Sequence, residues 1–192
     1  LHMSIQDYLN QKILSNYDES HWEEVPFRTT KKEFKKGELI TQFGQIERRA
    51  YFLLDGIIES SILKDGEVKI IDFVFPGQFI CSYTSFLIQT NSEIQTKAIT
   101  DCEVEFFLKE DIENAYDTSL VANKIGRHIT ERFLIKKLKR ERDFLTKSAK
   151  ERYMNLILES PEVIKEIPVN KIAKYLGIHP ESLSRIRSEI IS

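Results

Sequence analysis

The hydrophobic positions near the carboxyl end of the chain recur at helical spacing, in two short runs separated by a turn. Gly177 begins the turn, because a helix C-terminus needs the backbone freedom of glycine. Pro180 suits the first position of the helix that follows, with His179 as its N-cap. Residues 169–190 therefore predict two short helices around a tight turn. Their inward positions are Ile172, Ala173, Leu176, Leu183 and Ile186.

The second of these helices separates its apolar and polar positions onto opposite faces. Glu181 and Arg185 stand four residues apart near its N-terminus, on the face that the apolar residues leave free. Such a helix suits the major groove, so the pattern predicts a helix-turn-helix that binds double-stranded DNA. An ordinary pair of packed helices with a solvated Glu–Arg pair is the alternative. The candidates for base reading are Glu181, Ser182, Ser184 and Arg185, and those for phosphate contacts are Lys171, Lys174, His179 and Arg187.

One long helix is predicted upstream, because the stretch from Leu120 to Phe144 contains no proline and only one glycine, Gly126. Its first half carries apolar residues at spacings of three and four, which indicates a partial coiled-coil seam. Its second half is rich in Lys and Arg. Ser148 and Glu151 then form a capping box, which predicts a further helix over residues 149–159 and a hinge just before it.

The front half of the chain has a different pattern, in which short β-rich runs alternate with glycines roughly ten residues apart. The turn Lys64–Glu67 contains Asp-Gly, which suits the positive φ angles of a hairpin. Evenly spaced turns between short strands predict a small antiparallel barrel or jelly roll. With the helical back half, the fold class is α+β. The predicted strands are Ala50–Leu54, Ile57–Leu63, Val68–Phe75 and Val104–Leu108.

Both halves resemble one family. VNKIAKYLGIHPESLSRIRSEI, together with FKKGELI and YFLLDGIIESSILKDGEVKIIDFVFPGQF, resembles the Crp/Fnr (catabolite activator) family of bacterial transcription regulators. The resemblance implies a cyclic-nucleotide-binding-like β-roll at residues 4–118, a dimerisation helix and hinge at 119–147, and a helix-turn-helix domain at 148–192. It also implies a homodimer, a palindromic operator and RNA polymerase as a partner.

The resemblance assigns roles to particular residues. The family's base contacts fall on Glu181 and Arg185. The best-studied members place a further base-reading Arg where this chain has Pro180, so we expect one guanine contact to be absent. The alternative for the dimer seam is that its residues pack only against the β-roll. The seam residues are Ala122, Ile125, Ile129 and Phe133.

The segment Gly77–Ala98 departs from the family pattern for binding cyclic AMP. Relatives that bind it open this segment with Gly-Glu and close it with Arg-Ser or Arg-Thr, and the Arg neutralises the buried phosphate. Here Cys81 and Ser82 stand at the first pair. Ser92 and Glu93 stand near the second, and the segment contains no Arg. We therefore expect no cyclic AMP and no other cofactor.

On the long helix, Lys137 and Leu138 occupy the approximate positions of the Thr-Ser pair that contacts the base of the cyclic nucleotide in the family.

A different small effector is a separate hypothesis. The polar residues that follow Cys81 could line a cavity for a small neutral molecule, or the interior could be filled and purely structural. The candidate pocket residues are Ser82, Tyr83, Thr84, Ser85 and Lys97.

Charge divides the chain. Residues 1–123 hold 12 Lys and Arg against 21 Asp and Glu, whereas residues 124–152 hold 11 against 4. An acidic front and a basic back fit a sensor domain followed by a nucleic-acid-binding domain, although a charged helix is often merely solvated.

Other classes of protein lack their characteristic residues here. Cys81 and Cys102 have no metal-ligand spacing and are too few for an iron–sulfur cluster. No nucleophile or phosphate-loop motif occurs, so we expect neither an enzyme nor a metal site. No apolar run approaches the ~20 residues that span a bilayer, which favours a cytoplasmic protein without a membrane partner. The histidines, none in the strand region where a cupin-type enzyme needs them, are His2, His21, His128 and His179.

Overall fold

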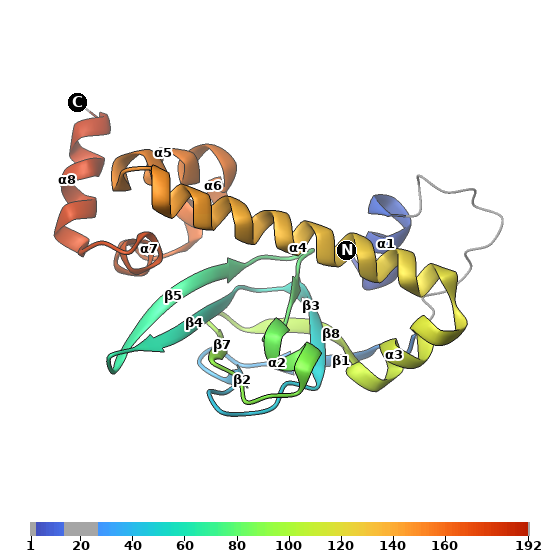
Figure 1. Cartoon of the computed structure of the whole chain (residues 1–192). Helices are drawn as coiled ribbons and strands as arrows, with labels where there is room; N and C mark the ends of the chain where they lie inside the picture. Colours follow the sequence, from blue (N-terminus) through green and yellow to red (C-terminus); the bar gives the residue numbers. More distant parts are fainter. Residues whose placement is uncertain (1–2, 14–26, 192) are drawn as a thin grey trace. The chain divides into compact units, whose positions relative to one another are not determined.

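The computed structural model describes residues 3–13 and 27–191 (Figure 1). It divides into two compact units. The first unit contains Phe73–Arg132 and the described residues up to Ser61. The second contains Ile62–Asp72 and the chain from Phe133 on. The boundary lies inside α4 (Leu120–Thr146), the predicted long helix. The three segments predicted from the sequence have boundaries that differ from those of the two units. This division into three stays a prediction.

Two four-stranded sheets form the β-roll, which confirms the predicted α+β class. The strand order is β1-β8-β3-β6 in one sheet and β2-β7-β4-β5 in the other, and β8 pairs antiparallel with both β1 and β3. The four predicted strands fall on β3, β4, β5 and β8. The strands are β1 Thr30–Phe34, β2 Leu39–Thr41, β3 Arg49–Asp55, β4 Ile58–Lys64, β5 Glu67–Val74, β6 Phe79–Ile80, β7 Ile94–Ala98 and β8 Cys102–Leu108.

The turn between β4 and β5 has the predicted hairpin geometry. Both central residues have positive φ, 53° at Asp65 and 78° at Gly66, which Asp and Gly tolerate better than other residues. The end of this hairpin, Ile62–Asp72, belongs to the second unit.

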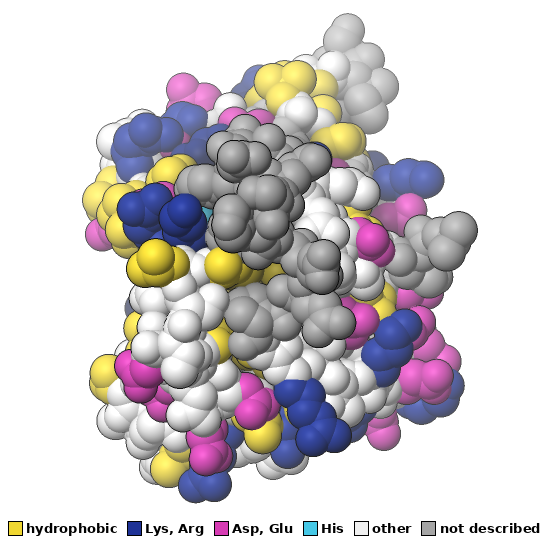
Figure 2. Space-filling view, turned by 90° about the vertical axis from the view of Figure 1, so that its right-hand side faces the viewer, with side chains coloured by type: hydrophobic (Ala, Val, Ile, Leu, Met, Phe, Trp, Pro, Cys, Tyr) yellow, Lys and Arg dark blue, Asp and Glu magenta, His cyan; other side chains and the backbone are white. Residues whose placement is uncertain are grey.

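The core of the first unit lies between β3 and three helices: α1 (Ile5–Lys12), α3 (Lys109–Thr118) and the first turns of α4. Phe52 of β3 is fully buried there. Gly126 explains how α4 approaches α3 so closely, because a Cβ at this position would overlap the Tyr116 ring. On the face seen in Figure 2, acidic and basic side chains are interspersed among the described residues.

Four short helices follow α4 in the second unit. The predicted capping box begins the first of them: Ser148 Oγ accepts from the Glu151 N–H, and the Glu151 carboxylate accepts from the Ser148 N–H at 2.7 Å. The second was not predicted, because six residues are too few for a periodic pattern. The four helices are α5 Ala149–Glu159, α6 Pro161–Glu166, α7 Val169–Leu176 and α8 Pro180–Ile191.

Aromatic rings and guanidinium groups hold α7 against α4 and α5. The guanidinium carbon of Arg140 lies 4.0 Å from the Tyr175 ring centroid and 4.7 Å from that of Phe144. That of Arg152 lies 4.5 Å from the Phe144 centroid. Arg140 also donates to the Tyr175 carbonyl, and Arg152 donates to the Leu176 carbonyl, each at 3.0 Å. The two arginines thus satisfy carbonyls at the C-terminus of α7 and fix its position.

Candidate nucleic-acid interface

The predicted helix-turn-helix is formed by α7, the turn after it, and α8. Gly177 has φ +70°, and its N–H and that of Ile178 bond back to carbonyls of α7. Helix α8 begins at Pro180, as predicted. Its inward residue Leu183 is fully buried, as is the apolar stripe of α7, whereas Ile186 is only half-buried.

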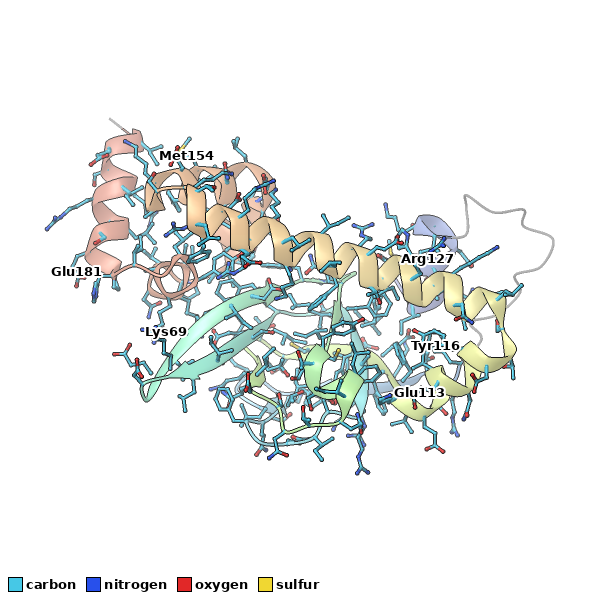
Figure 3. All side chains as sticks on the ribbon, viewed as in Figure 1. Lys69, Glu113, Tyr116, Arg127, Met154 and Glu181 are labelled. Carbon is cyan, nitrogen blue, oxygen red and sulfur yellow. The ribbon has the colours of Figure 1, made fainter. Side chains whose placement is uncertain are left out.

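The four base-reading candidates are exposed on α8. Figure 3 shows Glu181 in the first turn of this helix. Within the described part of the chain, neither Glu181 nor Arg185 forms a hydrogen bond or an ion pair. Their charges are therefore available to a partner that approaches the face opposite Leu183.

The phosphate candidates lie on the same motif. Lys174 and His179 are exposed, and Lys171 and Arg187 are half-buried. Glu189, one of the two acidic residues of α8, forms an ion pair with Lys150 of α5 at 2.8 Å. Because that charge is compensated inside the unit, Glu181 is the only acidic residue of α8 that faces a partner without a counter-charge among the described residues.

The basic part of α4 uses much of its charge inside the second unit. Lys136 pairs with Asp72 at 2.7 Å, and Lys139 pairs with Glu159. Arg140 is stacked between two rings, as described above. The excess of Lys and Arg in residues 124–152 therefore reflects internal ion pairing as well as any attraction to DNA.

The residues of the predicted dimer seam differ in how accessible they are, and the seam itself stays a prediction. Ala122 and Ile125 are 0% and 1% exposed in the core of the first unit, and Ile129 packs against that core. Phe133 is half-buried. Helical spacing identifies residues that share a face, but a core and a coiled-coil seam have the same spacing. Here the alternative holds for Ala122 and Ile125, which pack against the β-roll.

The segment Gly77–Ala98, which contains α2 (Tyr83–Ile88), carries a network of buried serines. Ser82 Oγ and Ser92 Oγ lie 2.6 Å apart. Ser85 Oγ accepts from the Glu47 N–H at 2.8 Å and donates to the Thr90 carbonyl at 2.5 Å. These hydroxyl groups therefore already have hydrogen-bond partners inside the roll.

Glu47 is the charged member of the network, and it is 2% exposed. Its carboxylate accepts from Thr41 Oγ1 and, at 3.1 Å, from the Arg49 N–H. Burial raises the pKa of Glu47, and these hydrogen bonds act in the opposite direction. No local pattern in the sequence marks this residue, because the groups that surround it come from three different elements, β2, β3 and α2.

Comparison with known proteins finds a family model that matches the β-roll segment. Residues 31–119 match the family model of the cyclic nucleotide-binding domain. No curated protein matches the chain by sequence.

Solved structures extend the likeness to most of the chain. FixK2 from Bradyrhizobium japonicum is similar with a TM-score of 0.69 at 21% identity, over 85% of this chain and 84% of that one. A Crp/Fnr-family transcriptional regulator from Thermus thermophilus has a TM-score of 0.65 at 19% identity, over 84% and 86%. The c-di-GMP-responsive global regulator CLP of Xanthomonas campestris has one of 0.64 at 14%, over 84% and 86%. The chain thus has the fold of Crp/Fnr transcription regulators, which confirms the resemblance at the level of fold.

The structure does not gather the five candidate pocket residues of the β-roll around one space. Ser82 and Ser85 are buried in the hydrogen-bonded network, whereas Thr84 is exposed on α2. Lys97 lies on β7 between two buried neighbours, so strand alternation directs it away from the interior. The fifth candidate, Tyr83, meets α4.

Thr130 of α4, which contacts α2, was not among the residues predicted from the sequence. The Tyr83 hydroxyl lies 2.9 Å from Thr130 Oγ1. The resemblance placed Lys137 at a position that contacts the base of the cyclic nucleotide. In the structure, burial lowers the pKa of Lys137, and the negative charge of Asp72 acts in the opposite direction. Leu138, its neighbour, is 54% exposed. The sequence of α4 contains no residue that shows which of its positions contacts α2. The two positions chosen by resemblance, Lys137 and Leu138, lie about two turns beyond the contact that the structure shows.

The described residues were also compared with the requirements of a metal site and of a membrane span. Among residues 3–13 and 27–191, no group of three or more His, Cys, Asp or Glu side chains could hold a metal ion. His128 Nε2 is buried on α4 and has no hydrogen-bond partner in that part of the chain. His2 and His21 lie outside the described residues. No described helix is long and apolar enough to cross a membrane.

Proposed function

We propose that the chain is a sequence-specific DNA-binding transcription regulator of the Crp/Fnr type that acts as a homodimer. One observation carries the proposal: α8 presents Glu181 and Arg185, both without a partner among the described residues, on the face opposite the buried Leu183. Arg binds O6 and N7 of guanine, and Glu accepts from the amino group of cytosine, so the pair reads adjacent base pairs. The phosphate contacts come from Lys171, Lys174, His179 and Arg187.

The second copy binds along the second half of α4. Leu134, Leu138 and Leu145 are 53%, 54% and 80% exposed, and their spacing of four and seven residues places them on one coiled-coil seam. Ile135, 65% exposed, widens this apolar stripe. The stripe replaces the seam expected from the sequence. Two copies joined in this way fit a palindromic operator with half-sites about 34 Å apart.

The β-roll of this regulator does not bind cyclic AMP in the family manner. Gly77–Ala98 contains no Arg to neutralise a buried phosphate, and Glu93 adds a negative charge. The serines that remain are engaged with each other and with Glu47. We expect no heat of binding in calorimetry with cyclic AMP at millimolar concentration. A micromolar dissociation constant would contradict this part of the proposal.

Selection from a library of random duplexes tests the main proposal. We expect the purified chain to enrich a palindromic site that contains G·C pairs, with an affinity that falls steeply as salt rises. The matched control is the double variant Glu181→Ala, Arg185→Ala, which should enrich no site. If the wild-type chain enriches no more than this control, the chain is an interaction protein whose helix-turn-helix no longer reads DNA.

Sedimentation tests the dimer. Leu138→Glu places like charges opposite each other at the seam and should yield monomers. Leu87→Glu on α2 is the matched control, because Leu87 is 50% exposed and lies in the β-roll. We expect this control to remain dimeric. An unchanged dimer of Leu138→Glu would place the interface elsewhere.

A further inference from the structure

The second unit contains both surfaces on which the proposed function depends. The apolar stripe for the second copy lies on α4, and the base-reading candidates lie on α8. Between them the chain passes through α5, α6 and α7, so the backbone alone does not fix the direction of α8. The direction of α8 relative to the stripe therefore depends on side-chain contacts between these helices.

Phe144, in the last turn of α4, lies where such contacts meet. The guanidinium carbons of Arg140 on α4 and Arg152 on α5 lie 4.7 and 4.5 Å from its ring centroid. A Cβ at Gly177, which ends α7, would lie 3.3 Å from the same ring. The ring itself is 40% exposed, so it is not part of a buried core. Groups from α4 and α5 and the turn that leads to α8 thus converge on one ring at the surface of the unit.

Hydrogen bonds from the two guanidinium groups hold the end of α7. Arg140 Nη2 donates to the Tyr175 carbonyl at 3.0 Å, and its guanidinium carbon lies 4.0 Å from the Tyr175 ring centroid. Arg152 donates from Nη1 to the Lys147 carbonyl at 2.7 Å and from Nη2 to the Leu176 carbonyl at 3.0 Å. Lys147 lies in the link between α4 and α5, so one guanidinium group bonds both this link and the last residue of α7. Charged donors form strong hydrogen bonds, and carbonyls at a helix C-terminus lack partners inside the helix.

The contacts with α7 and the apolar stripe lie on different faces of α4. Arg140 and Phe144 are four residues apart, so they share one face of the helix. At about 100° per residue, this face lies roughly 120° around the helix axis from the stripe formed by Leu134, Leu138 and Leu145. Helix α4 thus presents one face to the second copy and another to α7. A contact that fixes α7 on α4 therefore also fixes the helix-turn-helix relative to the axis of the proposed dimer.

We propose that Arg140, Phe144 and Arg152 are positioning residues that set which spacing of half-sites the dimer accepts. The inference rests on the proposed function of a DNA-binding homodimer. Two recognition helices held at a fixed angle fit one separation of half-sites, because each added base pair moves a half-site by about 3.4 Å and turns it by roughly 35° around the duplex. Helices held at a variable angle accept neighbouring spacings as well.

Replacement of arginine by lysine separates positioning from attraction to DNA. The planar guanidinium group of Arg152 lies against a ring while it donates to two carbonyls, which the compact ammonium group of lysine does not reproduce. The positive charge is kept, so the long-range attraction to phosphates is unchanged. A loss of spacing preference in such a variant therefore reports the geometry of the contacts and not the net charge.

Duplexes that carry two selected half-sites with spacers of different lengths test the inference. We expect the wild type to bind its preferred spacing about tenfold more tightly than a spacing changed by one base pair, and the double variant Arg140→Lys, Arg152→Lys about threefold or less. A duplex with a single half-site should bind both proteins equally, because the residues of α8 are the same. Arg142→Lys is the matched control: its side chain is on the same helix, is 64% exposed and pairs with the neighbouring Asp143. This control should keep the spacing preference of the wild type.

Thermal unfolding by circular dichroism shows which variants are folded at the temperature of the binding experiment. If the double variant is unfolded there, Arg152→Lys alone takes its place, with an expected preference between those of the wild type and the double variant. Contacts that only stabilise the fold would lower the melting temperature and leave the spacing preference of the folded protein unchanged. That result, or an equal loss of preference in Arg142→Lys, would overturn the inference.

The same duplexes distinguish this inference from the proposed function. If the wild type enriches no duplex, the proposed DNA-binding function fails and the inference fails with it. If the wild type prefers one spacing and the folded double variant keeps that preference, only the inference fails. A wild type that binds its half-sites equally well at every spacing would also overturn the inference, while base reading by α8 would stand.

Discussion

The interior of the β-roll and the recognition helix α8 are both rich in polar side chains, and they use them in opposite ways. The serines of Gly77–Ala98 and the carboxylate of Glu47 are buried, and each has partners within the roll. Glu181 and Arg185 are exposed and have none among the described residues. A satisfied group gains little from a ligand, because binding only exchanges one hydrogen bond for another. Polar groups of the roll therefore contribute to stability, and those of α8 remain available for binding.

The largest effect on the free energy of unfolding is expected when the hydrogen-bond network around Glu47 in the β-roll is broken. Thr41→Val removes a donor to the buried Glu47 carboxylate while keeping the shape of the side chain. Because a buried charge then lacks one of its hydrogen bonds, we expect the free energy of unfolding to fall by about 3 kcal/mol. Urea unfolding measures this loss. Binding of the folded protein to DNA should not change.

Thr84→Val is the matched control for that variant. Thr84 is exposed on α2, so we expect its replacement to change the free energy of unfolding by less than about 0.5 kcal/mol. Equal losses at Thr41 and Thr84 would mean that the network around Glu47 contributes nothing specific.

The converse effect is expected on α8. Arg185→Ala should cost about 1–3 kcal/mol of binding at the selected site and relax the preference at one G·C pair, without changing the free energy of unfolding. Fluorescence anisotropy with specific and random duplexes measures both parts. Lys174→Ala should weaken both duplexes alike and reduce the salt slope by about 1. Equal losses for Arg185→Ala on both duplexes would make Arg185 a phosphate contact.

Structural features that depend on a few neighbouring residues could be predicted from the sequence. The hairpin at Asp65-Gly66, the capping box at Ser148 and the turn at Gly177 each rest on a few neighbouring residues, and all three have the predicted backbone. The strands and the long helix follow from periodicity over a longer window. The helix-turn-helix could therefore be derived almost completely, including which residues of α8 are exposed.

Contacts between distant segments were not predictable in this way. The spacing of Ala122 and Ile125 is the same for a core and for a dimer seam, and only the position of the β-roll decides between them. Lys136 and Asp72 carry no local mark of their pairing, nor do Tyr83 and Thr130. In each case the chemical type of the residue is evident from the sequence, but the surface that faces it is not.

A smaller effect concerns the turn that presents α8. Gly177 has φ +70°, and a Cβ there would lie 3.3 Å from the Phe144 ring. We expect Gly177→Ala to destabilise the second unit by about 1–2 kcal/mol from the left-handed backbone, with a further loss from displacing the ring. Gly44→Ala is the control, because Gly44 has φ +78° and open space around it. Thermal unfolding should show a larger loss at Gly177, and an equal loss would limit the effect to backbone strain.

The smallest effect is the pH dependence that Glu47 gives to the roll. Burial raises its folded pKa above the ordinary value of 4.5, so the folded protein holds this proton after the unfolded chain has lost it. Stability is therefore lost as pH rises from the unfolded pKa to the folded one, and it is constant with respect to this group at higher pH. Glu47→Gln cannot ionise, so its stability relative to the wild type should increase as pH rises from about 4 to about 7. Urea unfolding of both proteins across this range measures the difference, and a difference that decreases with pH would mean that the hydrogen bonds from Thr41 and Arg49 outweigh burial. Since α8 carries no buried acid of this kind, DNA binding by the folded protein should not follow the same profile.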